Sequence, residues 1–153
     1  MISQFVFLLI AASLTFIGTE SSETTTIPIT AGTWEDDAHN WYRAFQREPP
    51  ADIVVVHSKY WRSDHWTDEY SYFFEVDASP EWRDGFLKNR NAQPVPSDKA
   101  RSFRDQVHSD FTPDWFAPGP VSDYEVWDDR PGYYGTIWIS KTNGHIFFWH
   151  RKV

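Results

Sequence analysis

The last third of the chain alternates between β-prone runs and turn signals, and this pattern limits the folds that are open to it. Segments 121–127, 133–140 and 145–152 are rich in aromatic and β-branched residues, which favour strands. The turn-prone run DDRPGY separates the first two segments, and Asn143-Gly144 separates the last two. An Asn-Gly pair between two such runs is the strongest short signal for a β-hairpin. The sequence therefore predicts a three-stranded antiparallel meander at this end of the chain.

A two-residue loop at Asn143-Gly144 would also set the register of the last hairpin and place Trp138 opposite Trp149. Side chains alternate between the two faces of a strand, so this hairpin has one face that is mostly aliphatic and aromatic. We assign that face to the core, and it carries Ile137, Ile139, Ile146 and Phe148.

The opposite face of this hairpin is aromatic, because it carries Trp138, Phe147, Trp149 and, towards its end, Arg151. The solvated face of an antiparallel sheet is normally polar. Two explanations remain open. Either a helix or the proline-rich loop 113–120 covers this face, or the face is an exposed recognition patch.

Two further strands are expected before the meander. Residues 52–61 begin with the β-prone run IVVV, and residues 69–76 alternate in the manner of a half-buried strand. The stretch HSKYWRSDHW, residues 57–66, contains the polar turn between them and is expected to be the distal end of a hairpin. The inward face of the second strand would carry Tyr70, Tyr72, Phe74 and Val76.

Helices are expected between these strands. Apolar residues recur at helical spacing over 33–47, and Pro49-Pro50 would end that helix. Ser79-Pro80-Glu81 is a typical helix start, with an end expected by Arg90, and 97–108 is expected to form a short third helix after a loop at 91–96. The predicted fold class is α+β: an antiparallel sheet of about five strands, namely one hairpin plus the meander, packed with two or three short helices.

The N-terminal segment indicates export. Residues 5–17 are thirteen uncharged, mostly apolar residues, the length of the apolar core of a signal peptide. A membrane-spanning helix needs about 20 such residues. We expect a signal peptide or membrane anchor over 1–21, a flexible tether over 22–32 and a single α+β domain over 33–153. The protein would be secreted or extracytoplasmic, held at the membrane by residues 1–18 only if they are not cleaved; a buried N-terminal helix is the other reading.

Composition excludes several classes of function. The net charge is −8 and the cations form no stripe, which argues against nucleic-acid binding. The absence of cysteine excludes disulfides, thiolate metal ligands and a cysteine nucleophile. The six histidines have no metal-binding spacing, and no Gly-rich phosphate loop or nucleophile motif occurs. We therefore expect no metal, no cofactor and no catalytic residue.

Two clusters of aromatic and polar side chains are candidate ligand-binding residues. The first lies around the first hairpin turn, and the second on the aromatic face of the last hairpin. Aromatic rings can stack on sugar rings while neighbouring polar groups take the hydroxyls, although the same rings can simply pack a core. The candidates are Tyr60, Trp61, Asp64, Trp66, Trp138, Phe147, Trp149 and Arg151.

These observations predict an exported or membrane-tethered, non-catalytic binding domain whose partner is a protein or an envelope polysaccharide. One alternative is an aromatic-platform carbohydrate-binding module. Another is a small cofactor-free hydrolase that uses a His–Asp pair, with His65 beside Asp64 and Asp68 or His108 beside Asp105 and Asp110 as the available pairs. A deep pocket in which His and Asp converge would favour the hydrolase.

Overall fold

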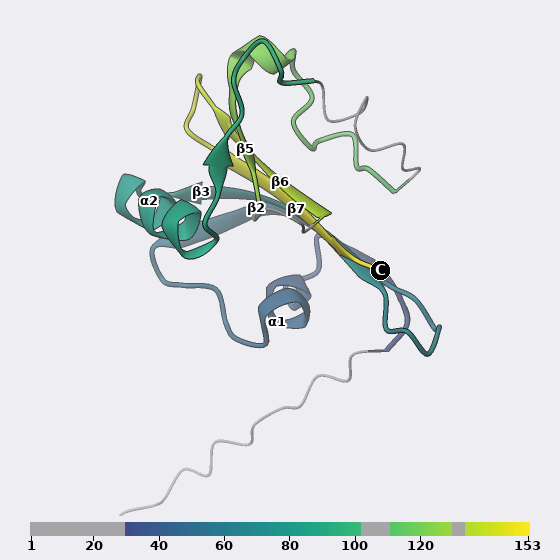
Figure 1. Cartoon of the computed structure of the whole chain (residues 1–153). Helices are drawn as coiled ribbons and strands as arrows, with labels where there is room; N and C mark the ends of the chain where they lie inside the picture. The colour runs from purple at the N-terminus through teal and green to yellow at the C-terminus, as the bar shows by residue number, and fades with distance from the viewer. Residues whose placement is uncertain (1–29, 102–110, 130–133) are drawn as a thin grey trace, which may run out of the picture.

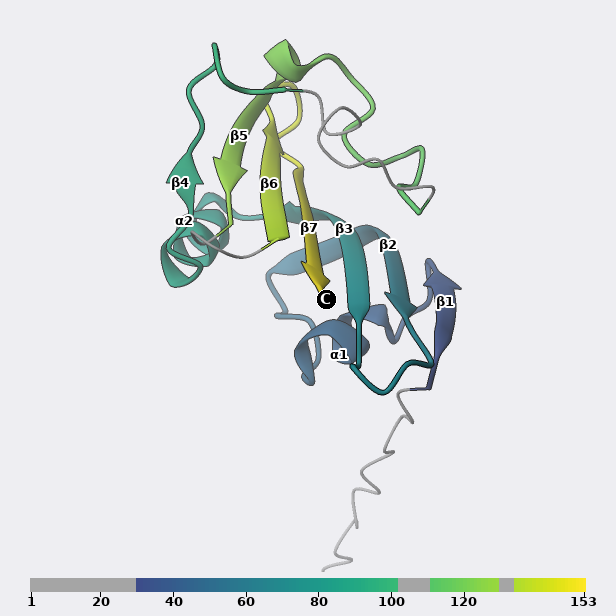
Figure 2. The same cartoon turned by 45° about the vertical axis from the view of Figure 1, so that its right-hand side comes forward.

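A computed structural model describes residues 30–101, 111–129 and 134–153, which form one antiparallel sheet with two helices on one of its faces (Figure 1). The strands lie side by side in the order β1-β2-β3-β7-β6-β5-β4 (Figure 2). In chain order the elements are β1 (Gly32–Glu35), α1 (Asn40–Phe45), β2 (Ile53–Arg62), β3 (Tyr70–Ala78), α2 (Pro80–Asn89), β4 (Gln93–Pro94), the 3₁₀ turn η1 (Val121–Asp123), β5 (Tyr124–Asp128), β6 (Tyr134–Ser140) and β7 (Ile146–Lys152).

The predicted α+β class is confirmed, but the sheet has seven strands instead of about five. The expected hairpin is β2–β3 and the expected meander is β5–β6–β7, and the antiparallel pairing of β3 with β7 joins them into one sheet. The two additional strands, β1 and β4, lie at the edges. Strand β4 has only two residues and ends in Pro94, and proline is tolerated on an edge because no neighbour needs its missing N–H.

The helix predicted over 33–47 is wrong in its first half. Gly32–Glu35 is strand β1, whose Trp34 pairs with Tyr60 of β2, and the chain then turns at Asp36 with a φ of 49°. The spacing of the apolar residues fits a helix, but as part of an edge strand Trp34 packs its partly buried ring against Tyr60. Helix α1 consists only of Asn40–Phe45.

Helix α2 matches the prediction closely. The hydroxyl of Ser79 caps it by accepting a hydrogen bond from the backbone N–H of Trp82 (3.1 Å), Pro80 is its first residue, and the helix ends at Asn89. Its apolar side, with Trp82 and Phe86, packs on the sheet.

The register predicted for the last hairpin is wrong by two residues. Trp138 pairs with Phe147, and Trp149 pairs with Thr136. The loop consists of four residues, 141–144, in which Gly144 alone has a positive φ (78°), so the type I′ turn that needs two such residues does not form. The predicted faces survive this error, because a shift of two residues returns every side chain to the same side of a strand.

The two faces of the sheet carry separate cores. On the face that α1 and α2 cover, the buried residues are Trp41, Ile53, Tyr60, Tyr72, Phe74, Val76, Ile137, Ile139, Ile146 and Phe148. The loop that carries Phe116 covers the other face, where the buried residues are Phe73, Phe116, Tyr124, Val126, Trp138 and Phe147. The aromatic face of the last hairpin is thus largely covered by loop 113–120, one of the two arrangements left open by the sequence.

Several expectations lie outside the described residues: the N-terminal segment 1–29, most of the helix expected over 97–108, and the DDRPGY turn. Residues 97–99, which are described, form a turn. Within the described ranges, no helix has the length and apolarity needed to cross a bilayer.

Candidate ligand-binding pocket

A pocket of about 510 Å³ opens between α1, α2 and the neighbouring strands β3 and β7. Pockets for small organic molecules usually measure about 300–1,000 Å³ and combine apolar walls with a few polar groups. This pocket has both. Its aromatic lining consists of Trp41, Phe45, Tyr70, Tyr72, Trp82 and Phe86, and Gly85 and the polar residues Arg47, Asn89, Arg90, Asp129 and His150 complete it.

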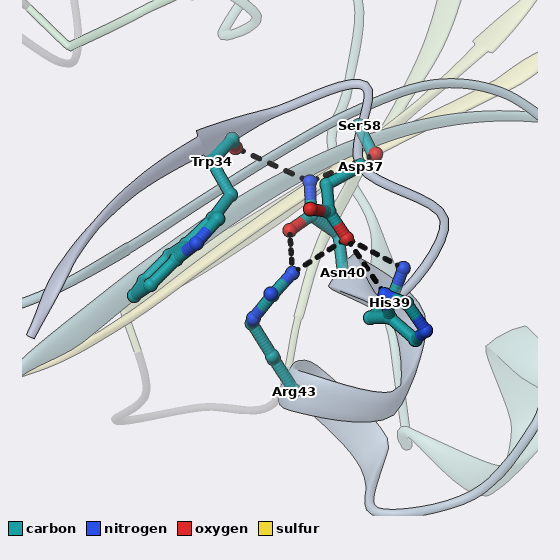
Figure 3. A network of polar contacts seen from close by, with 6 residues as sticks. All are labelled: Trp34, Asp37, His39, Asn40, Arg43 and Ser58. Atoms are coloured by element: carbon teal, nitrogen blue, oxygen red, sulfur yellow. Dashed lines mark hydrogen bonds and ion pairs between the residues drawn. The ribbon is translucent and has the colours of Figure 1, made fainter. Parts of the chain in front are cut away.

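A buried polar network holds α1 against the sheet and so positions one wall of the pocket (Figure 3). The fully buried side-chain amide of Asn40 donates to the hydroxyl of Ser58 (3.0 Å) and to the carbonyl of Trp34 (3.2 Å). Arg43 in turn donates to the Asn40 side-chain carbonyl and to the Asp37 carboxylate, both at 2.9 Å. Hydrogen bonds from Arg43 and from a backbone N–H hold the pKa of Asp37 below its ordinary value.

Gly85 lies in the opposite wall, within α2. Glycine inside a helix destabilises it by roughly 0.5–1 kcal/mol relative to alanine. A Cβ atom at this position would meet no atom within 4 Å, so close packing does not require glycine here. The missing side chain leaves space in the pocket, next to the stacked rings of Trp82 and Phe86, whose centroids lie 4.7 Å apart.

Four polar side chains converge at one end of the pocket. The Arg90 guanidinium donates to the carboxylate of Asp129, with which it forms an ion pair, and to the hydroxyl of Tyr72 at 3.0 Å. Nδ1 of His150 lies 3.8 Å from Oδ2 of Asp129, and the His150 ring stacks on Tyr72 at 5.4 Å. Their elements are distant in sequence: Arg90 follows α2, Asp129 follows β5, and the other two form a cross-strand pair of β3 and β7.

Gly135 permits the buried position of Asp129, whose side chain is only 2% exposed. A Cβ atom at residue 135 would lie 2.9 Å from Oδ2 of Asp129, closer than such atoms normally approach. The absence of a side chain on this part of β6 therefore makes room for the carboxylate.

The ionisation of the cluster follows from its contacts. Burial raises the pKa of the Asp129 carboxyl, but the neighbouring His150 and Arg90 outweigh it, and the pKa is below its ordinary value. Burial lowers the pKa of the Arg90 guanidinium, but Tyr72 and Asp129 outweigh that effect and the pKa is raised. Burial also raises the pKa of the Tyr72 hydroxyl, more than Arg90 lowers it. At neutral pH the cluster therefore contains a carboxylate, a guanidinium and a protonated phenol.

The sequence-predicted ligand-binding residues do not come together at this pocket, and none of them lines it. Tyr60 is 1% exposed, on the face that the helices cover, while Trp138 and Phe147 are buried in the core of the opposite face. Trp149 is half-buried there, and its indole N–H donates to the hydroxyl of Ser71 (2.9 Å). Tyr60, Trp138 and Phe147 therefore belong to the two cores.

The stretch HSKYWRSDHW does form the distal end of a hairpin, as predicted. Its aromatic side chains point in different directions, because Tyr60 and Trp61 are adjacent in β2 and face opposite sides of the sheet. Trp66, in the turn, is 87% exposed. Asp64, also in the turn, and Arg151, near the end of β7, are exposed as well.

The His–Asp pairs considered from the sequence are not assembled either. The His65 ring contacts the hydroxyl of Thr67 (3.0 Å), and Asp68 forms an ion pair with Arg62. The pair around His108 lies outside the described residues. A different pair, His150 with Asp129, meets in the pocket.

Sequence reasoning missed the pocket because it forms across elements whose pairing the sequence does not specify. Tyr72 was expected to face inward, but only the contact between β3 and β7 brings His150 beside it. The sequence does contain one indication of the pocket. His150 alternates to the same inward face of β7 as Ile146 and Phe148, so the alternation predicts a titratable side chain on an otherwise apolar face.

In the described part of the chain, no group of three or more His, Asp and Glu side chains is arranged to hold a metal ion. Comparison of the chain with known protein families, with curated proteins and with solved structures finds no match. The chemistry of the pocket is therefore the basis for a functional proposal.

Proposed function

We propose that the protein is a non-catalytic binding domain whose aromatic-walled pocket takes a small organic molecule with a flat, apolar body. The observation that carries this proposal is the pocket of about 510 Å³ between α1, α2 and the sheet. Gly85 supports this proposal. Glycine weakens α2 at a position where a larger side chain would fit, and it leaves space in the pocket. Aromatic walls would stabilise a flat ligand by stacking and by burial of its apolar surface.

Export, with or without a remaining membrane tether, is part of the proposal. It is supported by the thirteen uncharged residues at positions 5–17. A binding domain outside the cytoplasm would meet ligands of its surroundings, and envelope polysaccharide or protein remains an alternative partner for the exposed Trp66 at the hairpin tip.

Filling the pocket should abolish binding of an apolar probe. The fluorescence of the neutral dye N-phenyl-1-naphthylamine rises in apolar surroundings, so we expect it to titrate with one site on the wild-type protein. Gly85→Leu should weaken this binding at least about tenfold, since its side chain would occupy the space that the dye needs. Asp84→Leu adds the same side chain to the same helix at an exposed position that does not line the pocket, and should bind as the wild type does.

Circular dichroism of both variants provides the control for folding. Because leucine favours helix over glycine, Gly85→Leu should be at least as stable as the wild type. Equal dye binding by the wild type and a folded Gly85→Leu variant, or no saturable binding at all, would contradict the proposal.

A cofactor-free hydrolase is the second candidate, favoured by the convergence of His150 and Asp129 in the pocket. It ranks second because the two side chains lie 3.8 Å apart and the same carboxylate oxygen is already paired with Arg90. His150 would act as a general base on a water molecule, since no serine, threonine or cysteine is among the described residues that line the pocket. The binding proposal predicts that the wild type and His150→Gln hydrolyse 2-naphthyl acetate at equal, slow rates. Turnover by the wild type that exceeds that of His150→Gln about a hundredfold, while His39→Gln keeps the wild-type rate, would favour the hydrolase.

A further inference from the structure

We infer that the ligand of this pocket is an aromatic monoanion, whose single oxyanion group, such as a carboxylate, binds to Arg90 and Tyr72. The inference rests on the proposed function, because it specifies the ligand class of the same pocket. It follows from three features: the hydrogen-bond donors at the polar end, the balance of charge over the pocket lining, and the rings beside the donors.

The donors are available and held in place. A guanidinium has five N–H bonds, and Arg90 directs one to Asp129 and one to Tyr72. The Tyr72 hydroxyl accepts from Arg90, so its own proton remains for an acceptor. Both residues line the pocket, and two adjacent donors suit the two oxygens of a carboxylate.

The charge of the pocket lining as a whole favours an anion. The chain has 22 acidic and 14 basic side chains, yet the described residues that line the pocket include two arginines, Arg47 and Arg90, and one carboxylate. That carboxylate, Asp129, is 2% exposed and is engaged by Arg90, whereas Arg47 is exposed and forms no ion pair within the described ranges. The excess of one positive charge matches one negative charge on the ligand, and a second negative charge would face Asp129 without compensation.

The rings next to these donors favour an aromatic body. The Arg90 guanidinium lies over the ring of Phe86 at 4.8 Å, and Phe86 stacks on Trp82. The Phe86 ring on one side and two polar partners at the edge of the guanidinium therefore hold Arg90 in place. Because the side chain is already ordered, it loses little conformational entropy when an anion binds. A flat ligand with its acid group at the guanidinium would place its rings beside Trp82 and Phe86.

A matched pair of ligands tests the inference. 2-Naphthoate and 2-naphthamide have the same shape and differ in charge, and each can be titrated against the protein with bound N-phenyl-1-naphthylamine. We expect the naphthoate to displace the dye with at least about tenfold higher affinity at neutral pH and low salt, because a charge-assisted hydrogen bond is stronger than a neutral one. Tyr72→Phe should lower this ratio severalfold, whereas Tyr42→Phe, which alters a tyrosine outside the pocket, should leave it unchanged.

Removing Arg90 alone would strand a buried carboxylate, so its role is tested in the double variant Arg90→Met/Asp129→Leu. This variant lacks the guanidinium donors, so its preference for the naphthoate over the naphthamide should fall at least severalfold, with folding checked by circular dichroism. The inference would be overturned if the wild type bound naphthoate and naphthamide with equal affinity, or if neither Tyr72→Phe nor the double variant changed the ratio of the two affinities. Dye binding would in that case leave the proposed function intact. If the dye itself does not bind, the proposed function fails.

Discussion

Trp138→Ala is expected to lower the free energy of unfolding by about 3–5 kcal/mol, the usual effect of deleting a large buried aromatic side chain. The Trp138 ring is 1% exposed and packs edge-on against Tyr124, with centroids 5.5 Å apart. Its indole N–H donates to the hydroxyl of Thr136 at 3.1 Å, a buried bond that the variant also loses. Because small domains are stable by about 5–15 kcal/mol, urea unfolding should show a large decrease.

Trp149→Ala is the matched control, because it deletes the same side chain from the same face of the same hairpin. Trp149 is half-buried, so we expect a smaller loss of about 1–2 kcal/mol, from its hydrogen bond to Ser71 and its cross-strand contacts. Equal effects of the two substitutions would contradict the observed register and the difference in burial between Trp138 and Trp149.

Asp129→Ala is expected to have an effect of similar size, for a different reason. The substitution leaves the Arg90 guanidinium, whose side chain is only 16% exposed, without its ion-pair partner. Removing one partner of a buried pair typically destabilises a protein by about 3–5 kcal/mol. The double variant Arg90→Met/Asp129→Leu replaces both charges with apolar groups and should recover most of that loss. A single variant as stable as the wild type would show that Asp129 does not hold Arg90.

The contribution of Asp129 should also depend on pH. Its pKa in the folded protein is below its ordinary value of 3.8, so between these two values the unfolded chain binds more protons than the folded protein. The stability that Asp129 supplies is therefore fully present above the ordinary pKa and is lost as the pH falls through the folded pKa. We expect the difference in unfolding free energy between wild type and Asp129→Asn to shrink over that acidic range, and a constant difference would contradict the ion pair.

Local features of the chain are sufficient for much of the fold. The capping hydroxyl of Ser79 and the proline after it determine where α2 begins, and both act within one helical turn. The alternation around Tyr72 and Phe74, and that around Ile137 and Phe148, determines which side chains face inward. Such patterns depend on the geometry of a single strand, so they hold even where the register was predicted wrongly.

The tertiary structure decided what depends on contacts between distant segments. Residues 32–35 pair with β2 as a strand and Trp34 packs on Tyr60, although the apolar spacing favoured a helix. Pairing of β3 with β7 joined the hairpin to the meander, and any of several strand orders would have satisfied the same alternation.

The candidate site could not be predicted from the sequence for the same reason. Arg90, Asp129, Tyr72 and His150 come from four separate parts of the chain, and none of them has a neighbour in sequence that marks it as a site residue. The aromatic clusters that the sequence emphasised were mostly used to fill the two cores. Composition and periodicity thus determine which side chains are buried. The pocket and its charge depend on which elements pack together, and that packing is set by the free energy of the whole domain.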